Sequence, residues 1–215
     1  MNKPQLPLPL EVVGRTPPSF LIGQCNRVAA ELVLRWPDWP TQLVYLCGPP
    51  ASGKSILVSE WTRHSSGAII HAAESIPQTL TSNIAVEGIE ALADEAGLFH
   101  LINEAALQRR SVLLTARLSP AALPVRLPDL QTRLRAATLA EIGPPDEAFL
   151  QELLVMLANR AQIAIDAAVA SYCVTRMERT QLAAVNLISA LNRRSLGEGR
   201  KVNLKMAAEV LGDAS

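Results

Sequence analysis

The sequence predicts an α/β fold, in which a parallel sheet flanked by helices is followed by a small all-helical domain. Short apolar runs rich in β-branched residues alternate with amphipathic segments before residue 141, a pattern typical of a parallel sheet covered by helices. A Gly-Pro-Pro break follows at 143–145, and only helical patterns come after it. The chain has 215 residues, 49% of them hydrophobic and 19% charged, which is enough for one core and a small second one.

The elements before the break are assigned from residue spacing and from Gly, Pro and charge signals. Strands are expected at 42–48, 67–72, 82–88 and 111–116. Helices are expected at 26–35, 54–64, 94–110 and 129–135. Asn26 is a candidate N-cap of the first helix. The 94–110 helix would place acids in its first turn and arginines in its last, as the helix dipole favours.

Four helical stretches are expected after the break, at 146–160, 166–176, 180–194 and 203–211. The third carries an apolar stripe at helical spacing, made of Leu182, Val185, Ile188 and Leu191. The chain therefore divides into three parts, with a hinge near 142–146. These parts are an extended arm at 1–12, an α/β domain at 13–143 and a helical domain at 144–215.

The strongest chemical signal is GPPASGKS at residues 48–55, between an expected strand and an expected helix. It fits the P-loop pattern G-x-x-x-x-G-K-[ST]. Glycines let backbone N–H groups surround a phosphate, the following helix presents its positive end, and Lys54 adds a point charge. A chance turn is the alternative, which the flanking strand and helix disfavour. The nucleotide-contacting residues expected here are Gly48, Pro49, Pro50, Ala51, Ser52, Gly53, Lys54, Ser55 and Ile56.

A magnesium ion would find two oxygen ligands near this loop. Ser55 offers a hydroxyl, and Glu87 ends an apolar run as the acid expected at the end of a second strand. The alternative for Glu87 is an ordinary exposed acid at a strand end. The next residue is Gly88, which cannot orient an attacking water as a carboxylate would.

Four stretches together resemble the AAA+ proteins related to the bacterial replication initiator DnaA, and especially their shortened, Hda-type members. They are SFLIGQCNRVAAEL (19–32), YLCGPPASGKSIL (45–57), LLTARLSP (113–120) and LPDLQTRL (127–134). The resemblance covers nearly the whole chain. It implies a P-loop AAA+ domain with a helical lid, ADP or ATP with Mg²⁺ as cofactors, and Asn26 near the nucleotide. It also implies that Arg133 is an arginine finger that acts on a nucleotide in a neighbouring subunit.

Three departures from the family pattern concern hydrolysis. Gly88 stands where a second acid is usual, and Arg117 stands where an aspartate is usual. Leu182 falls at the position of the sensor 2 arginine, with Arg179 one turn earlier as a candidate substitute that contacts the nucleotide. Loss of these groups weakens transition-state stabilisation more than nucleotide binding. The sequence therefore predicts a nucleotide-binding protein with weak or no ATPase activity of its own.

The N-terminal segment QLPLPL resembles the clamp-binding motif of the Hda-type proteins. Its prolines keep it extended, while Gln5, Leu6, Leu8 and Leu10 offer one polar group and three apolar contacts to a groove. An arm packed on its own domain is the alternative. The resemblance implies that the polymerase sliding clamp and DnaA are its partners in the regulation of replication initiation. Association of the chain with itself, as a homo-oligomer, is also compatible with the resemblance.

Charge and composition bear on the competing functions. Lys and Arg number 20 and Asp and Glu 20, which argues against strong direct DNA binding. An autonomous P-loop NTPase and a DNA-binding initiator or helicase-loader relative are the alternatives. Cys25, Cys47 and Cys173 are scattered, and no apolar run is long enough for a bilayer. We therefore expect a cytoplasmic protein without membrane contact.

Overall fold

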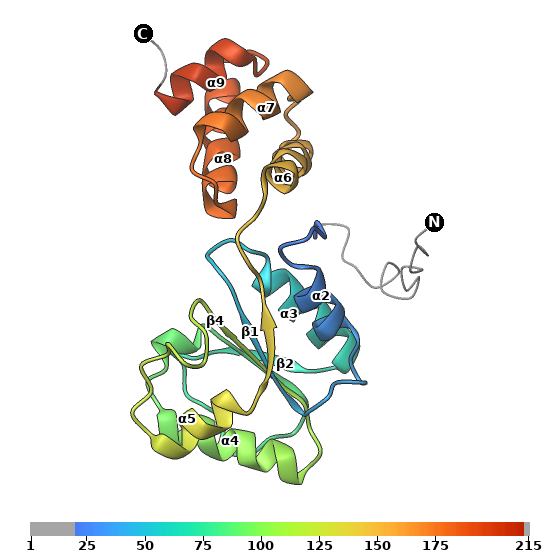
Figure 1. The fold of residues 1–215 in the computed structure, drawn as a ribbon, viewed down its shortest axis with the longest axis vertical. Coiled ribbons are helices and arrows are strands. Elements are labelled where there is room, and N and C mark those ends of the chain that lie inside the picture. The colour runs from blue at the N-terminus through green and yellow to red at the C-terminus, as the bar shows by residue number, and fades with distance from the viewer. Residues whose placement is uncertain (1–19, 213–215) are drawn as a thin grey trace, which may run out of the picture.

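The computed structural model describes residues 20–212, which form an α/β part and a helical part (Figure 1). The expected arm, with Gln5, Leu6, Leu8 and Leu10, lies outside the described residues. Five parallel strands make one sheet in the order β2-β3-β4-β1-β5. The strands are β1 (Leu43–Cys47), β2 (Ala68–His71), β3 (Ile84–Glu87), β4 (Val112–Ala116) and β5 (Thr138–Glu141).

Strand β5 is absent from the sequence-based assignment. It has only four residues, TLAE, and it lies at the edge of the sheet, where Leu139 is 45% exposed. A short edge strand does not need the continuous apolar run that marks a buried parallel strand. Pairing with β1, from Val44 opposite Thr138 to Cys47 opposite Glu141, determines its register. This strand leads the chain directly to the helical part.

Successive strand residues face opposite sides of the sheet, and each side is covered by two helices. Val44 and Leu46 share a core with residues of α2 (Arg27–Leu34) and α3 (Lys54–Ser65). Tyr45 and Cys47 share the opposite core with α4 (Glu95–Leu107) and α5 (Pro128–Arg135). Figure 1 shows the two helix pairs on the two sides of the strands. The α/β part is thus a three-layer structure.

Helix α4 ends earlier than its charge pattern suggests. Arg109 adopts a left-handed backbone with φ of 53°, and the N–H of Arg110 donates to the carbonyl of Ala105 at 2.8 Å. This arrangement is a Schellman motif, which closes a helix at its C-terminus. The two arginines therefore follow the last helical turn and are not part of it, contrary to the expectation for 94–110.

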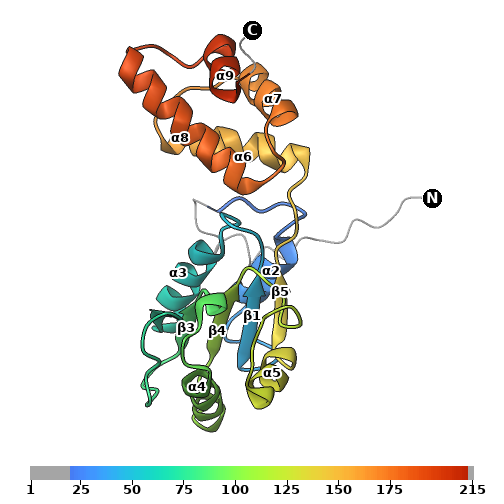
Figure 2. The same ribbon diagram turned by 90° about the vertical axis from the view of Figure 1, so that its left-hand side faces the viewer.

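Four helices make up the C-terminal part. They are α6 (Glu147–Arg160), α7 (Ala167–Arg176), α8 (Gln181–Glu198) and α9 (Leu204–Leu211). Each begins at a side chain that accepts a hydrogen bond from the backbone three residues on, namely Asp146, Asp166, Thr180 and Asn203. The four helices enclose an apolar core of their own. They lie beyond the carboxyl end of the sheet, where β5 leaves it (Figure 2).

The buried face of α8 is rotated relative to the expected stripe. Ile188 and Leu191 are buried, whereas Leu182 is 42% exposed and Val185 is half-buried. Leu187, which lies outside the expected stripe, is buried. Helix α8 packs against both α6 and α9, so its apolar face is wider than one stripe.

Three further features concern the part of the chain that the structure describes. Within residues 20–212, no helix is both long and apolar enough to cross a membrane. The same residues contain no group of three or more His, Cys, Asp or Glu placed to hold a metal ion. Cys47 and Cys173 are buried and Cys25 is half-buried, and all three are free thiols.

Candidate functional site

The loop between β1 and α3 has a backbone that its glycines make possible. Gly53 has φ of 91°, and a Cβ there would lie 2.6 Å from Cε2 of Phe20. A Cβ on Gly48 would lie 2.8 Å from Cβ of Ile142. Both positions therefore exclude a side chain for steric reasons, and Gly53 also needs its positive φ. Ala51 adopts a φ of 60°, a conformation uncommon outside glycine that is typical of strained functional loops.

Lys54 is folded back over this loop. Its ammonium donates to the carbonyl oxygens of Gly48 at 2.7 Å and Pro49 at 2.9 Å, and to the Ser52 hydroxyl at 3.4 Å. Burial lowers the pKa of Lys54, because desolvation disfavours the charged form. The first N–H groups of α3 have no acceptor within the helix. A cation and several donors therefore converge at one point. This arrangement, the Lys54 cradle, is suited to an anion.

A cavity of about 400 Å³ opens beside the cradle, between the loop, the segment before α2, and helices α6 and α8. It is lined by Phe20, Leu21, Asn26, Ala51, Ser52, Gly53, Lys54, Ser55, Ile56, Phe149, Leu153, Met156, Leu157, Arg160, Gln181 and Val185. Most of the lining away from the loop is apolar. The cavity can therefore receive a flat apolar group next to an anion.

Seven of the residues expected to contact a nucleotide line this cavity, and four do not. Asn26 and the run Ala51–Ile56 are in the lining. The carbonyl of Gly48 accepts from the Lys54 ammonium, and Pro49 and Pro50 line a different hollow beside α8. The Arg179 side chain is 69% exposed and pairs with Glu147 at 3.5 Å. The structure therefore places Arg179 outside the cavity, against the α6 side of the helical part.

Asn26 has a different role from a side-chain N-cap. Its Oδ1 accepts from the N–H of Gly23 at 2.9 Å, and its Nδ2 donates to the carbonyl of Leu21 at 2.8 Å. No side-chain hydrogen bond caps α2. The buried carboxamide instead holds the backbone at 21–23, which forms one wall of the cavity. Asn26 is thus a positioning residue for that wall.

A second hollow of about 300 Å³ lies on the other side of the loop, at the ends of β3 and β4. Ser55 and Glu87, the two expected metal ligands, both line it together with Lys54. Gly88 turns the chain with φ of 72°, and its N–H donates to the Thr115 hydroxyl at 3.1 Å. The hollow therefore brings two oxygen ligands to the same side of the loop as the ammonium.

Sequence reasoning missed Glu90, which lines the same hollow. It lies in η1 (Ile89–Ala91), the short 3-10 helix after β3. Its Oε1 is 3.2 Å from Nε of Arg117, and the backbone N–H of Arg117 donates to its Oε2 at 3.4 Å. The sequence signal for Glu90 was its spacing, three residues after Glu87. A tight turn directly after a strand brings such a residue back over the end of the strand.

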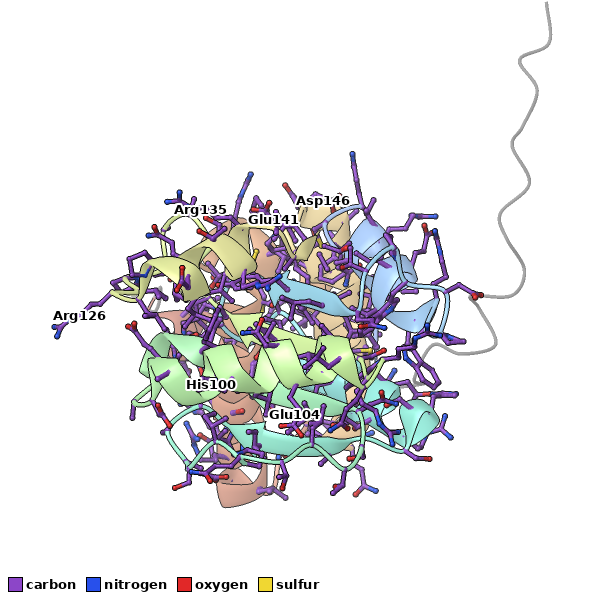
Figure 3. The ribbon with its side chains drawn as sticks, turned by 90° about the horizontal axis from the view of Figure 1, so that it is seen from below. His100, Glu104, Arg126, Arg135, Glu141 and Asp146 are labelled. Carbon is purple, nitrogen blue, oxygen red and sulfur yellow. The ribbon has the colours of Figure 1, made fainter. Side chains whose placement is uncertain are left out.

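Arg133 lies on α5 and lines neither hollow. Its side chain is exposed. Figure 3 views this end of the molecule, and Arg126 before α5 and Arg135 at its end both point outward there. Glu95 anchors the start of α5, because its carboxylate accepts from the N–H groups of Arg126 at 3.0 Å and Leu127 at 2.7 Å. The helix thus presents arginines to the exterior on a well-held backbone.

Comparisons with known proteins bear on the fold. No family model matches the chain. A protein of Haemophilus influenzae, described only as uncharacterized, is 23% identical over 230 residues and is aligned over 98% of this chain and 99% of its own length.

The solved structures that resemble this one include domain III of the Thermotoga maritima replication initiation protein DnaA. It has a TM-score of 0.79 and 16% identity, over 91% of this chain and 94% of that one. A replication initiator DnaA bound to AMPPCP and single-stranded DNA has a TM-score of 0.67 and 15% identity, over 84% and 66%. The Thermotoga maritima RuvB Holliday junction branch migration motor has a TM-score of 0.63 and 17% identity, over 86% and 65%. The parallel five-stranded sheet, its P-loop and its C-terminal helices form the AAA+ P-loop fold.

Proposed function

We propose that this chain is a DnaA-related AAA+ regulator of chromosomal replication initiation, of the Hda type, which binds ADP or ATP. The observation that carries the proposal is the Lys54 cradle next to an apolar cavity. The phosphates bind at the cradle, where the ammonium exchanges loop carbonyls for phosphate oxygens, and the base enters the apolar cavity. The AMPPCP described for a DnaA of the same fold supports this use of the site.

Magnesium fits the second hollow. Mg²⁺ usually binds through one or two protein oxygens together with substrate phosphates and water. Ser55 and Glu87 supply such oxygens beside Lys54. The ion would neutralise phosphate charge, while Ser55 and Glu87 orient it relative to the loop.

The regulatory step acts in trans. We infer that residues Gln5, Leu6, Leu8 and Leu10 bind the sliding clamp, and that Arg133 then contacts ATP held by DnaA and promotes its hydrolysis. The exposure of Arg133 away from both hollows supports a role on a partner's nucleotide. Gly88 in place of a second acid supports weak hydrolysis by the isolated chain. Balanced charge supports a route to DNA through the clamp.

Nucleotide binding is tested by titrating the wild type and Lys54→Ala with fluorescent ADP. We expect the substitution to weaken binding by roughly 10- to 100-fold, because a charge-assisted contact is lost. Lys205→Ala is the matched control, since Lys205 is an exposed lysine of α9. Equal affinities of the wild type and Lys54→Ala would refute the assignment of the cradle.

The regulatory part needs two further measurements. A pull-down with the sliding clamp compares the wild type with Gln5→Ala/Leu8→Ala, and failure of the wild type to bind would remove the adaptor role. ATP hydrolysis by DnaA is then followed with clamp loaded on DNA. We expect Arg133→Ala to abolish the stimulation and the neighbouring Arg135→Ala to retain it. Unchanged stimulation by Arg133→Ala would exclude it as the finger.

An autonomous P-loop NTPase is the second candidate, and one observation favours it. Glu90 and Glu87 line the same hollow as Lys54, so Glu90 is a carboxylate that could orient water despite Gly88. The ion pair with Arg117 would have to open for that role. Robust steady-state turnover by the isolated wild type, lost in Glu90→Gln with ADP affinity retained, would establish this second function.

A further inference from the structure

Gln181, the first residue of α8, is buried without a partner. The residue is 2% exposed, and neither Oε1 nor Nε2 has a hydrogen-bond partner among the residues the structure describes. The start of α8 does not use it, because Thr180 accepts from the N–H of Ala183 at 3.1 Å and so caps the helix. A buried amide with unmade hydrogen bonds is rare and destabilising.

The residues around Gln181 indicate which kind of ligand group could bind next to it. It lines the 400 Å³ cavity beside the Lys54 cradle. Val185 lies one helical turn later on the same cavity wall, and Phe149 and Leu153 of α6 line it as well. A flat aromatic group fits such walls, but its polar edge would find few partners among them. The Gln181 carboxamide offers both a donor and an acceptor. Both atoms are buried behind the apolar lining, so a rotation of the side chain is needed to bring them to the cavity.

We propose that Gln181 determines base specificity by pairing with the edge of adenine. Its Oε1 accepts from the exocyclic amino group, and its Nε2 donates to the adjacent ring nitrogen, the bidentate geometry that glutamine forms with adenine. The pairing satisfies both buried atoms of Gln181 at once. This inference rests on the proposed function, since it needs an adenine nucleotide with its phosphates at Lys54.

The test measures ADP and GDP affinity for the full chain and two variants. Gln181→Met keeps the length of the side chain and removes both hydrogen bonds, so ADP affinity should fall about 10- to 100-fold. Gln181→Glu keeps the shape but only accepts hydrogen bonds. It should repel the ring nitrogen of adenine and accept from the two donors on the guanine edge, so the ratio of ADP to GDP affinity should fall further. Gln151→Met, on α6 outside this cavity, should retain the wild-type ratio.

A second readout separates base recognition from a structural role. The free Gln181→Met protein should melt at the wild-type temperature or above it, because an unsatisfied amide has been removed. Its thermal shift on adding ADP should shrink. A lower melting temperature of the free variant, with an unchanged ADP shift, would overturn the proposal.

The outcomes distinguish this inference from the proposed function. Suppose that the wild type binds ADP in a Lys54-dependent manner and both Gln181 variants keep its ADP to GDP ratio. The inference then fails, and the proposed function stands. If the wild type binds neither nucleotide, both fail together. If Gln181→Met does not fold, the ratio measured with the isosteric Gln181→Glu decides.

Discussion

At the scale of single residues, two buried carboxamide side chains distinguish the cavity. Asn26 and Gln181 are both 2% exposed and both border the cavity. The Asn26 side chain forms hydrogen bonds with the backbone of Leu21 and Gly23. The Gln181 side-chain oxygen and nitrogen have no hydrogen-bond partner within the described residues. Asn26 therefore positions the cavity wall, whereas the carboxamide of Gln181 has no role within the described part of the fold.

Asn26→Ala should destabilise the protein. The substitution leaves the N–H of Gly23 and the carbonyl of Leu21 without their partner, which costs about 1–3 kcal/mol of unfolding free energy. Urea unfolding of the free protein measures the loss. The exposed Asn159 of α6 provides the control, and Asn159→Ala should stay within about 0.5 kcal/mol of the wild type. Identical unfolding midpoints for the two variants would contradict the wall-positioning role.

The buried thiols should resist alkylation in the folded protein. Burial raises the pKa of Cys173 from 9.0 to about 11 and also raises the pKa of Cys47. Only the thiolate reacts, so iodoacetamide at pH 8 should label Cys173 far more slowly than in urea. Because the folded pKa lies above the unfolded one, this group stabilises the fold below pH 9.0 and loses that contribution as pH rises toward about 11. Equal labelling rates with and without urea would contradict it.

At the scale of elements, the start of α5 depends on a contact far along the chain. The Glu95 carboxylate at the start of α4 accepts from the backbone of Arg126 and Leu127. From the sequence alone, Glu95 is an acid that complements the α4 dipole. The structure adds a second role, in which it holds the helix that carries Arg133.

Glu95→Ala should loosen α5 before the rest of the fold. Two backbone N–H groups lose a charged acceptor, so amide hydrogen exchange across 126–135 should accelerate, with about 1–3 kcal/mol of global stability lost. Exchange followed by mass spectrometry resolves the segment. Glu152→Ala, on an exposed position of α6, should leave exchange at 126–135 unchanged. Uniform acceleration across the whole sheet would show that Glu95 acts globally instead.

At the scale of the whole molecule, one cavity joins the two parts of the chain. Its lining comes from the loop before α3, from the segment before α2, and from α6 and α8. The linker after β5 is held to the α/β part, because the N–H of Gly143 donates to the carbonyl of Cys25 at 2.8 Å. A ligand in this cavity would therefore contact both parts at once.

ADP should tighten the helical part against the α/β part. Binding to the folded state stabilises it by about 2.7 kcal/mol at a ligand concentration 100 times Kd, and contacts with α6 and α8 should slow their amide exchange. Thermal unfolding and exchange with and without ADP measure the two effects. Lys54→Ala should lose both at the same ADP concentration. Slower exchange confined to α3 would show that the nucleotide does not bridge the two parts.

Some elements could be predicted from the sequence, and others could not. The P-loop and its neighbouring strand and helix follow from local patterns, because the loop needs glycines at particular backbone angles and β1 needs a buried apolar run. Strand β5 and the buried face of α8 could not be predicted from local patterns, because both depend on which neighbouring elements cover them. Glu90 and Gln181 were missed for the same reason, as neither belongs to a local motif.

The α/β class, the P-loop and the helical tail could all be predicted from the sequence, because each depends on short-range backbone preference and apolar periodicity. The full set of polar side chains that line the two hollows could not be predicted from the sequence. The tertiary structure moved Arg179 outside, turned Asn26 toward the backbone, and placed Gln181 and Glu90 beside the loop. Side-chain partners across the fold depend on how whole elements pack, and local residue spacing does not specify that packing.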